Sequence, residues 1–123
     1  MAEIVYLNGA YRPSSEATVH YEDRGYQFSD GVYEVILVRR GRTVDAAPHL
    51  ARLDRSLAAL DIDAPLGAGP LNVIVAETIR RNRVVEGLVY IQVTRGVASR
   101  DHVFPGRARP SIVCVAKKRD WPA

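Results

Sequence analysis

Arg100 and His102 are the residues best suited to chemistry, and they stand on either side of Asp101. In an extended chain, side chains two residues apart point the same way. A planar guanidinium and an imidazole would then converge on one carboxylate, which makes the pair a candidate anion-binding site. The alternative is a solvated loop in which these side chains pair with Asp101. The sequence supports the two interpretations equally.

His49 and Arg52 form a second candidate pair. They are three residues apart, so on a helix they share one face. A guanidinium in that place could bind a phosphate through two parallel hydrogen bonds. The alternative is an exposed arginine whose aliphatic stem covers apolar neighbours, and the spacing taken alone favours that alternative.

Tyr33 is the third candidate, because it follows Asp30 and Gly31 at the start of an apolar run. A tyrosine after a glycine-containing loop can project its hydroxyl into a cleft and hydrogen-bond a substrate carboxylate. Most strand tyrosines instead pack their ring and leave the hydroxyl at the surface. The position taken alone favours packing.

Other kinds of site are poorly supported. The three histidines lack a short ligand spacing and Cys114 is the single cysteine, so no metal site is predicted. There is no Ser-His-Asp pattern and no Walker-type glycine pattern. Cys114 lies in an apolar run and is interpreted as a core residue. Arginine outnumbers lysine 15 to 2 and the net charge is +3, but the basic residues do not interleave with aromatic ones, so no nucleic-acid partner is predicted.

The composition is that of one globular domain. The chain has 123 residues, of which 47% are hydrophobic and 25% charged, enough for one core and too few for two domains. No apolar run approaches the roughly 20 residues that a membrane span needs. The N-terminus has neither a basic start nor an apolar segment after it, so no membrane partner and a cytoplasmic location are expected.

The strand pattern predicts two hairpins. Residues 4–12 read as a hairpin around Asn8 and Gly9, and residues 32–44 as a second one around Arg40 and Gly41. Further extended segments are expected at 17–20, 88–94 and 111–116. Residues 23–31 are predicted to be an ordered loop. The long segment 95–110 is a candidate functional loop.

Two helices are predicted between the hairpins and the last strands. Asp45 is a suitable N-cap for the first, and leucines at 50, 53, 57 and 60 give it one apolar stripe. The second runs from about Pro70 to Asn82. Strand runs flank the helices without regular alternation. The expected fold is therefore α+β, an antiparallel sheet of about six strands with two helices on one side.

The segment from Glu22 to Val35 resembles the signature region of fold-type IV (class IV) pyridoxal-phosphate-dependent enzymes, most closely the D-amino-acid aminotransferases. The resemblance extends over almost the whole chain. It implies that Tyr33 lies near the cofactor and the substrate carboxylate. It implies that Arg52 binds the cofactor phosphate and that His49 supports the wall of the site. It also implies that Arg100 and His102 bind the substrate carboxylate of a neighbouring subunit across a dimer interface.

In that family a lysine of a C-terminal domain holds the cofactor as a Schiff base. The only lysines here are Lys117 and Lys118, which end the last predicted strand. Residues 1–118 are therefore expected to be the N-terminal domain and residues 119–123 the start of an interdomain linker, with the lysine-bearing domain absent. The chain alone is expected to be inactive and is not expected to retain the cofactor.

The resemblance implies a two-step transamination between D-amino acids and 2-oxo acids in a homodimeric complete enzyme. Three alternatives stay open: an aminodeoxychorismate lyase, a branched-chain-type class IV enzyme, and a non-catalytic module for binding or oligomerisation. The Arg-x-His pair at Arg100 and His102 is typical of the D-amino-acid enzymes and favours the first interpretation.

Overall fold

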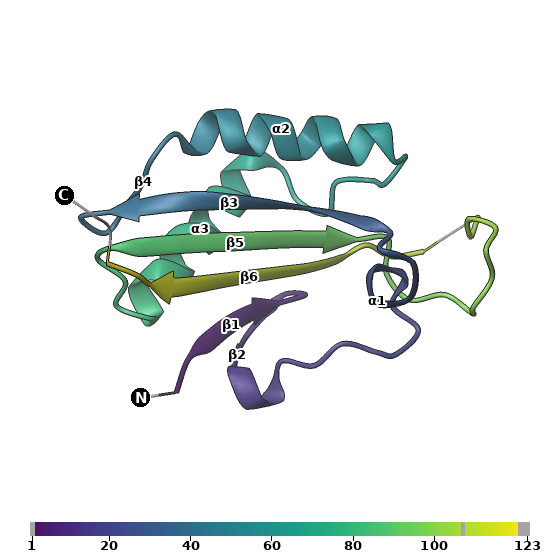
Figure 1. The fold of residues 1–123 in the computed structure, drawn as a ribbon, viewed down its shortest axis with the longest axis horizontal. Coiled ribbons are helices and arrows are strands. Elements are labelled where there is room, and N and C mark those ends of the chain that lie inside the picture. Colours follow the sequence, from purple (N-terminus) through teal and green to yellow (C-terminus); the bar gives the residue numbers. More distant parts are fainter. Residues whose placement is uncertain (1, 107, 121–123) are drawn as a thin grey trace.

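A computed structural model describes residues 2–106 and 108–120. Within them the chain forms one six-stranded antiparallel sheet, in the order β2-β1-β6-β5-β3-β4, and three α-helices (Figure 1). The elements are β1 (Ile4–Leu7), β2 (Ala10–Pro13), the 3-10 helix η1 (Ser14–Glu16), α1 (Arg24–Phe28), β3 (Gly31–Arg39), β4 (Arg42–Thr43), α2 (Ala46–Ala59), α3 (Ala68–Arg81), β5 (Gly87–Thr94) and β6 (Ser111–Lys118). The predicted α+β class and sheet are confirmed.

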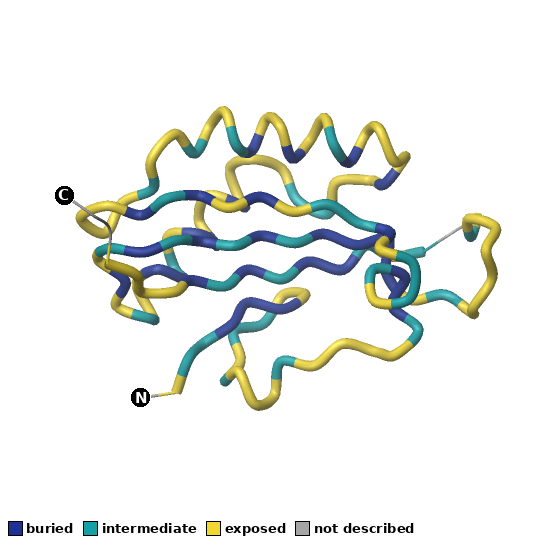
Figure 2. The backbone as a smooth tube through the Cα atoms, in the orientation of Figure 1, coloured by how far each residue is buried: buried dark blue, intermediate teal, exposed yellow. Residues whose placement is uncertain are grey.

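The sheet buries one face against α2 and α3. Alternate residues of the three long strands are buried there, such as Ile36 and Val38 on β3 and Val89 and Ile91 on β5 (Figure 2). This alternation follows from the two-residue repeat of a strand. The opposite face is open toward the viewer in Figure 1. The two predicted helices therefore lie on one side, as expected.

The apolar stripes of the helices agree with the sequence except at one end. Leu50, Leu53 and Leu57 of α2 are buried, while Leu60, predicted to continue the stripe, is the C-cap and is 37% exposed. In α3 all four predicted apolar residues are buried, namely Leu71, Ile74, Val75 and Ile79. Packing on the sheet therefore stabilises both helices more than capping at their ends does.

Both predicted hairpin turns are present. Asn8 and Gly9 have φ angles of 48° and 98°, and Arg40 and Gly41 have φ angles of 53° and 74°. Two successive residues with positive φ define a type I′ turn, which matches the twist of the flanking strands. The registers Leu7 with Ala10 and Arg39 with Arg42 follow directly from these turns.

Two local predictions are wrong, and a third is right in position but not in its hydrogen bond. Residues 17–20 join no strand, and the chain before them forms η1. The segment 23–31, predicted to be a loop, contains α1, which Asp23 caps by accepting a hydrogen bond from the Gly25 amide. Asp45 occupies the N-cap position of α2 but adopts a left-handed conformation, and its side chain makes no capping bond. At α1, contacts with residues distant in the sequence override local propensity.

The predicted long loop after β5 is present and is tied to α1 at its beginning. The Arg24 amide donates to the Gly96 carbonyl, the Ala98 amide donates to Glu22, and Asp23 forms an isolated bridge with Val97. Gly96 has a φ angle of +100°, and a Cβ atom there would overlap the Arg109 carbonyl oxygen. The loop therefore leaves the sheet through a conformation that only glycine adopts easily.

No helix within the described residues is long and apolar enough to cross a bilayer. The predicted linker at 119–123 is only partly visible, because residues 121–123 lie outside the described part of the chain. The predicted division into a domain and a linker therefore stays a prediction.

Candidate functional site

Glu34 joins the predicted pair His49 and Arg52 into one cluster. The Glu34 side chain is buried below the beginning of α2. Arg52 donates from Nε and Nη2 to its two carboxylate oxygens, both at 2.8 Å, and His49 Nδ1 lies 2.7 Å from Oε1. The three-residue spacing on α2 places both basic side chains over one strand residue. The sequence identified the two basic residues but not the acid between them.

The Glu34 carboxylate is ionised at neutral pH. The hydrogen bond from Arg52 lowers the pKa of Glu34, burial opposes this, and His49 adds to the lowering, so the pKa lies below its usual 4.5. The Arg52 side chain is 59% exposed, and its Nη1 has no hydrogen-bond partner among the described residues. Arg52 is therefore held in a fixed orientation with one edge turned toward solvent. Such an edge fits a phosphate group.

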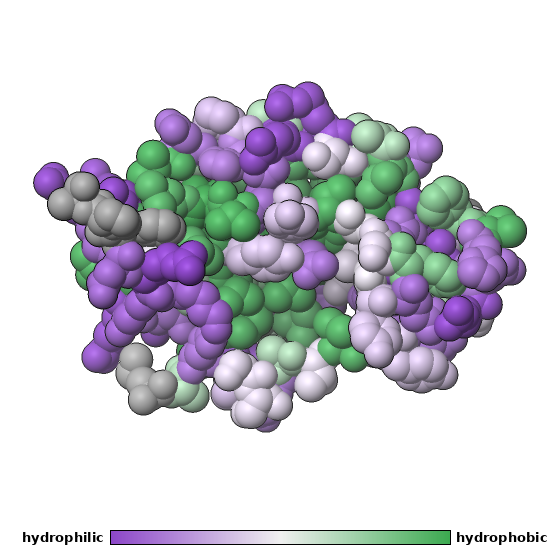
Figure 3. Space-filling model, viewed as in Figure 1, coloured by the Kyte–Doolittle hydropathy of each residue, from purple (hydrophilic) through white to green (hydrophobic). Residues whose placement is uncertain are grey.

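Tyr33 lies on the open face of the sheet. Its side chain is 63% exposed and its ring stacks on Tyr90 of β5, with centroids 5.6 Å apart. Val35 lies on the same face, where apolar side chains gather (Figure 3). Because β4 pairs only with Val38 and Arg39, no strand of the described chain pairs with the outer edge of β3 beside Tyr33. The hydroxyl is free to meet a ligand at this edge.

Arg100 and His102 meet on one aromatic ring. The Arg100 guanidinium carbon lies 5.6 Å from the centre of the Phe28 ring, and the His102 ring packs edge-on against it at 5.3 Å. The chain bends at Arg100 and His102, so the extended backbone assumed from the sequence is wrong. Neither side chain pairs with Asp101, whose carboxylate accepts from the Val103 amide instead. Their convergence comes from Phe28.

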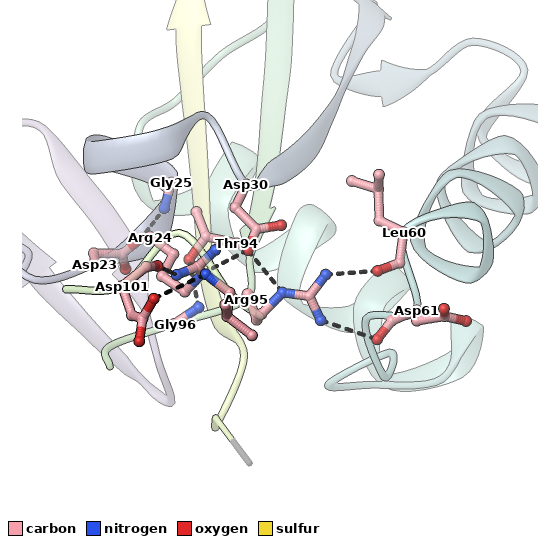
Figure 4. Close-up of polar contacts among 11 residues, drawn as sticks. Asp23, Arg24, Gly25, Asp30, Leu60, Asp61, Thr94, Arg95, Gly96 and Asp101 are labelled. Carbon is pink, nitrogen blue, oxygen red and sulfur yellow. Dashed lines mark hydrogen bonds and ion pairs between the residues drawn. The ribbon is translucent and has the colours of Figure 1, made fainter. Parts of the chain in front are cut away.

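A buried ionic cluster at the same end of the sheet was not predicted (Figure 4). Asp30 Oδ2 accepts from Arg24 Nε at 2.8 Å and from Arg95 Nε at 2.7 Å. Arg95 also donates to the carbonyls of Leu60 and Asp61 after α2. Burial alone would raise the pKa of Asp30, but Arg95 and Arg24 together outweigh it and hold the pKa below 3.8. No sequence pattern signalled this cluster, because Arg95 lies 65 residues after Asp30.

The structure brings together the members of each of the two basic pairs, but it does not bring the two pairs together. His49 and Arg52 meet on Glu34, and Arg100 and His102 meet on Phe28. Within the described residues Tyr33 contacts neither pair, and strand alternation turns it away from its neighbour Glu34. One chain therefore presents an isolated tyrosine and two separate basic pairs.

The two lysines lie far from these groups. Lys117 pairs with Leu88 across the sheet and Leu88 with Leu37, whereas Tyr33 is four residues nearer the opposite end of β3. That offset is about 13 Å along the sheet at roughly 3.3 Å per residue. Lys117 Nζ is also paired with Glu3 at 2.7 Å.

Two further features do not belong to the candidate site. A cleft of about 770 Å³ is lined by Asn8, Ser111 and Arg109 among others, but by none of the five candidate residues. Asn8 and Ser111 hydrogen-bond each other there. Cys114 is buried in the core, and burial raises its pKa to about 11, so the thiol stays protonated at neutral pH. No group of three potential metal ligands occurs among the described residues.

Sequence similarity shows the class of protein to which this chain belongs. The chain belongs to the amino-transferase class IV family, which it matches over residues 31–123. It is 40% identical over 119 residues to the D-alanine aminotransferase of Staphylococcus haemolyticus, a match that covers 96% of this chain and 42% of that enzyme. The chain thus spans about two fifths of the length of the curated relatives it matches.

Two solved structures show the same fold. The 4-amino-4-deoxychorismate lyase of Pseudomonas aeruginosa has a TM-score of 0.77 and 28% identity, over 96% of this chain and 41% of the lyase. The branched-chain aminotransferase of the thermophilic archaeon Thermoproteus uzoniensis, solved with norvaline, has a TM-score of 0.78 and 25% identity, over 96% of this chain and 41% of that enzyme.

Proposed function

We propose that this chain is the N-terminal domain of a pyridoxal-phosphate-dependent aminotransferase that acts on D-amino acids and 2-oxo acids. The observation that carries the proposal is the 40% identity over 119 residues to a D-alanine aminotransferase. The paired placement of Arg100 and His102 on Phe28 supports it, because a guanidinium and an imidazole on one ring suit a carboxylate ligand. The complete protein is proposed to be a cytoplasmic homodimer.

Arg52 is the residue of this chain proposed to hold the cofactor phosphate. Its Nε and Nη2 stay on Glu34, which fixes the plane of the guanidinium, and its exposed Nη1 edge donates to the phosphate. His49 completes the support by holding Glu34 from the other side. When bound, pyridoxal phosphate supplies the electron sink that a transamination requires.

Tyr33, Arg100 and His102 are proposed to bind the substrate. The exposed Tyr33 hydroxyl donates a hydrogen bond to the substrate carboxylate at the edge of β3. Arg100 and His102 extend from the loop after β5 and bind a carboxylate held by a neighbouring subunit. We call Arg100 and His102 the carboxylate trap. Because the trap serves a neighbouring subunit, it need not contact Tyr33 of its own chain. Which side of the cofactor the trap faces would then select the D-configuration.

Proton transfer requires a lysine that these residues do not place near the site. Lys117 is engaged by Glu3 at the opposite end of the sheet. We therefore propose that the remaining length of the relatives corresponds to a part that carries this lysine, and that residues 1–123 alone neither catalyse transamination nor retain the cofactor.

The decisive experiment uses a complete protein, in which this chain is joined to the part of its relatives that it does not span. D-alanine with 2-oxoglutarate should yield pyruvate, whereas aminodeoxychorismate and L-leucine should not react. Arg100→Ala should lower kcat/KM for D-alanine by roughly 30-fold or more, because a desolvated charged partner of the carboxylate is lost. A carboxylate-free amine should be almost unaffected. Equal losses for both substrates, or turnover of the lyase substrate, would overturn the proposal.

A further inference from the structure

Arg24 has a position unlike that of any other arginine in the described chain. It is the first residue of α1, it is only 2% exposed, and its own amide donates to the Gly96 carbonyl. A buried guanidinium is costly unless its charge is compensated and its N–H groups are used. Asp30 provides the compensation, through a hydrogen bond of 2.8 Å to Arg24 Nε.

The second bond of Arg24 goes to the loop that carries the proposed carboxylate trap. Arg24 Nη1 donates to the carbonyl oxygen of Asp101 at 2.7 Å. That carbonyl lies in the peptide chain between Arg100 and His102. The link spans 77 residues of sequence, and Figure 4 shows Arg24 between Asp30 and Asp101. The guanidinium fork thus joins a buried carboxylate to the backbone of the trap.

This bond is the main polar anchor of the loop. Within the described residues 99–106, no backbone-to-backbone hydrogen bond is made with the rest of the chain. The other hydrogen bond of that segment is internal, from the Val103 amide to the Asp101 carboxylate. No hydrogen bond except that of Arg24 therefore ties this described segment to the body of the domain.

Phe28 extends the same support to the side chains. The Arg24 guanidinium carbon lies 4.6 Å from the centre of the Phe28 ring. Arg100 and His102 contact that ring as well, at 5.6 Å and 5.3 Å. Arg24 therefore touches both the backbone between the two trap residues and the ring on which their side chains rest.

We propose that Arg24 is a positioning residue for substrate binding: fixed by Asp30, it holds the Asp101 carbonyl and sets the direction in which Arg100 and His102 project. The proposal rests on the carboxylate-binding role proposed above for those two residues. Arg24 itself is buried and does not touch the substrate. A lysine could not replace it, because a single ammonium lacks the fork that reaches Asp30 and Asp101 together.

The first test is spectroscopic and uses the 123-residue chain. The chain has three histidines, His20, His49 and His102, whose ring-proton resonances can be assigned one by one, and the Phe28 ring is expected to shift those of His102. In Arg24→Lys the His102 resonances should move toward those of an unstructured histidine. The His49 resonances should stay in place, because His49 is held by Glu34. Unmoved His102 resonances in a folded Arg24→Lys chain would overturn the proposal.

The second test is kinetic and uses the complete protein. Arg24→Lys should raise KM for D-alanine by about tenfold and change kcat by less than about twofold, since ground-state carboxylate binding is what it weakens. Arg95→Lys is the matched control. Arg95 shares the same Asp30 oxygen and contacts the loop only through the ring of Phe104, at 4.6 Å, while its other hydrogen bonds go to Leu60 and Asp61 and none goes to Asp101. The KM of Arg95→Lys should therefore rise clearly less than that of Arg24→Lys.

The outcomes separate the two proposals. If Arg100→Ala leaves KM for D-alanine unchanged, the carboxylate trap itself is wrong. If Arg100→Ala raises KM while Arg24→Lys does not, the trap stands and the positioning role of Arg24 is wrong. Should Arg24→Lys unfold, Arg24→Met removes the bond to Asp101 and leaves one buried anion, Asp30, paired with one buried cation, Arg95. That variant should show the same KM rise, and a wild-type KM would refute the role.

Discussion

Asp30→Asn should be among the most destabilising polar substitutions in this domain. The Asp30 side chain is 5% exposed, and those of its partners Arg24 and Arg95 are 3% and 11% exposed. Asparagine keeps the shape of the side chain and removes its charge. Two guanidinium groups would then remain buried against a neutral amide, whose oxygen accepts a hydrogen bond from one of them. Their other protein acceptors would be backbone carbonyls.

The expected loss of unfolding free energy in Asp30→Asn follows from the burial of this ion pair. Removing one partner of a buried ion pair costs about 3–5 kcal/mol, and the amide oxygen still accepts one hydrogen bond, so about 3 kcal/mol is expected. A small domain is stable by about 5–15 kcal/mol in total. With a urea dependence of about 2 kcal/mol per molar, the unfolding midpoint should fall by about 1.5 M.

Urea unfolding of the 123-residue chain, followed by circular dichroism at two protein concentrations, measures this loss and detects any contribution from association. Glu3→Gln is the matched control, because Glu3 forms an exposed ion pair with Lys117. An exposed pair contributes about 0–1 kcal/mol. The control should therefore shift the midpoint very little.

The stability lost in Asp30→Asn should depend on pH with a definite sign. The pKa of Asp30 in the folded chain lies below its ordinary value of 3.8, so the carboxylate stabilises the fold above that value. This contribution is lost as the pH falls through the lower, folded pKa. The difference between wild type and Asp30→Asn should therefore be constant above about pH 5 and shrink in stronger acid. A loss of stability in Asp30→Asn no larger than that in Glu3→Gln would refute the description of a buried, charge-coupled cluster. A difference in stability between wild type and Asp30→Asn that does not shrink in acid would also refute it.

Two other predictions concern the proposed phosphate contact and the exit of the long loop. In the complete enzyme, Arg52→Ala should raise the dissociation constant for pyridoxal phosphate by about tenfold or more, while Arg55→Ala on the exposed side of α2 should not. Absorbance after dialysis measures how much cofactor each variant retains. Equal retention by the two variants would show that Arg52 does not bind the phosphate. Gly96→Ala should destabilise the chain by about 2 kcal/mol or more because of its positive φ and the overlap with Arg109, whereas Gly69→Ala, with open space around it, should stabilise α3 by up to about 1 kcal/mol. Urea midpoints that move in the same direction for both glycines would contradict the strain at Gly96.

The sequence predicted most of the fold because its signals are local and mutually consistent. Two adjacent residues suited to positive φ located each hairpin turn, and leucine spacing located α2. The errors arose where long-range contacts decide. The helix α1 has five residues, too few for a periodic pattern, and it is held by hydrogen bonds to residues near 96. No pattern within residues 23–31 could reveal a partner that lies some seventy residues later.

The candidate site was predicted residue by residue, and its supporting groups were not. His49 and Arg52 could be paired from helical spacing. Arg100 and His102 were paired from their separation in an extended chain, a conformation that the loop does not adopt. Glu34 and Phe28 bring these pairs together, yet each lies on a different element from the pair it supports. Such contacts depend on how a strand packs below a helix and how a loop folds back on α1. Sequence spacing does not encode them.

The abundance of arginine has a structural reason in part of the chain. Arg24 uses one fork to hold Asp30 and the Asp101 carbonyl, and Arg52 holds both oxygens of Glu34 while one edge stays exposed. A lysine ammonium could bind one partner strongly in either place, but it could not keep a second direction fixed. Asp30 and Glu34, near the beginning of β3, thus act as anchors that orient cations whose remaining N–H groups do other work. The remaining N–H groups of Arg24 hold the loop, and those of Arg52 offer an anion a preorganised edge. An arginine-to-lysine change should therefore be mild on the surface of this domain and severe at these two positions.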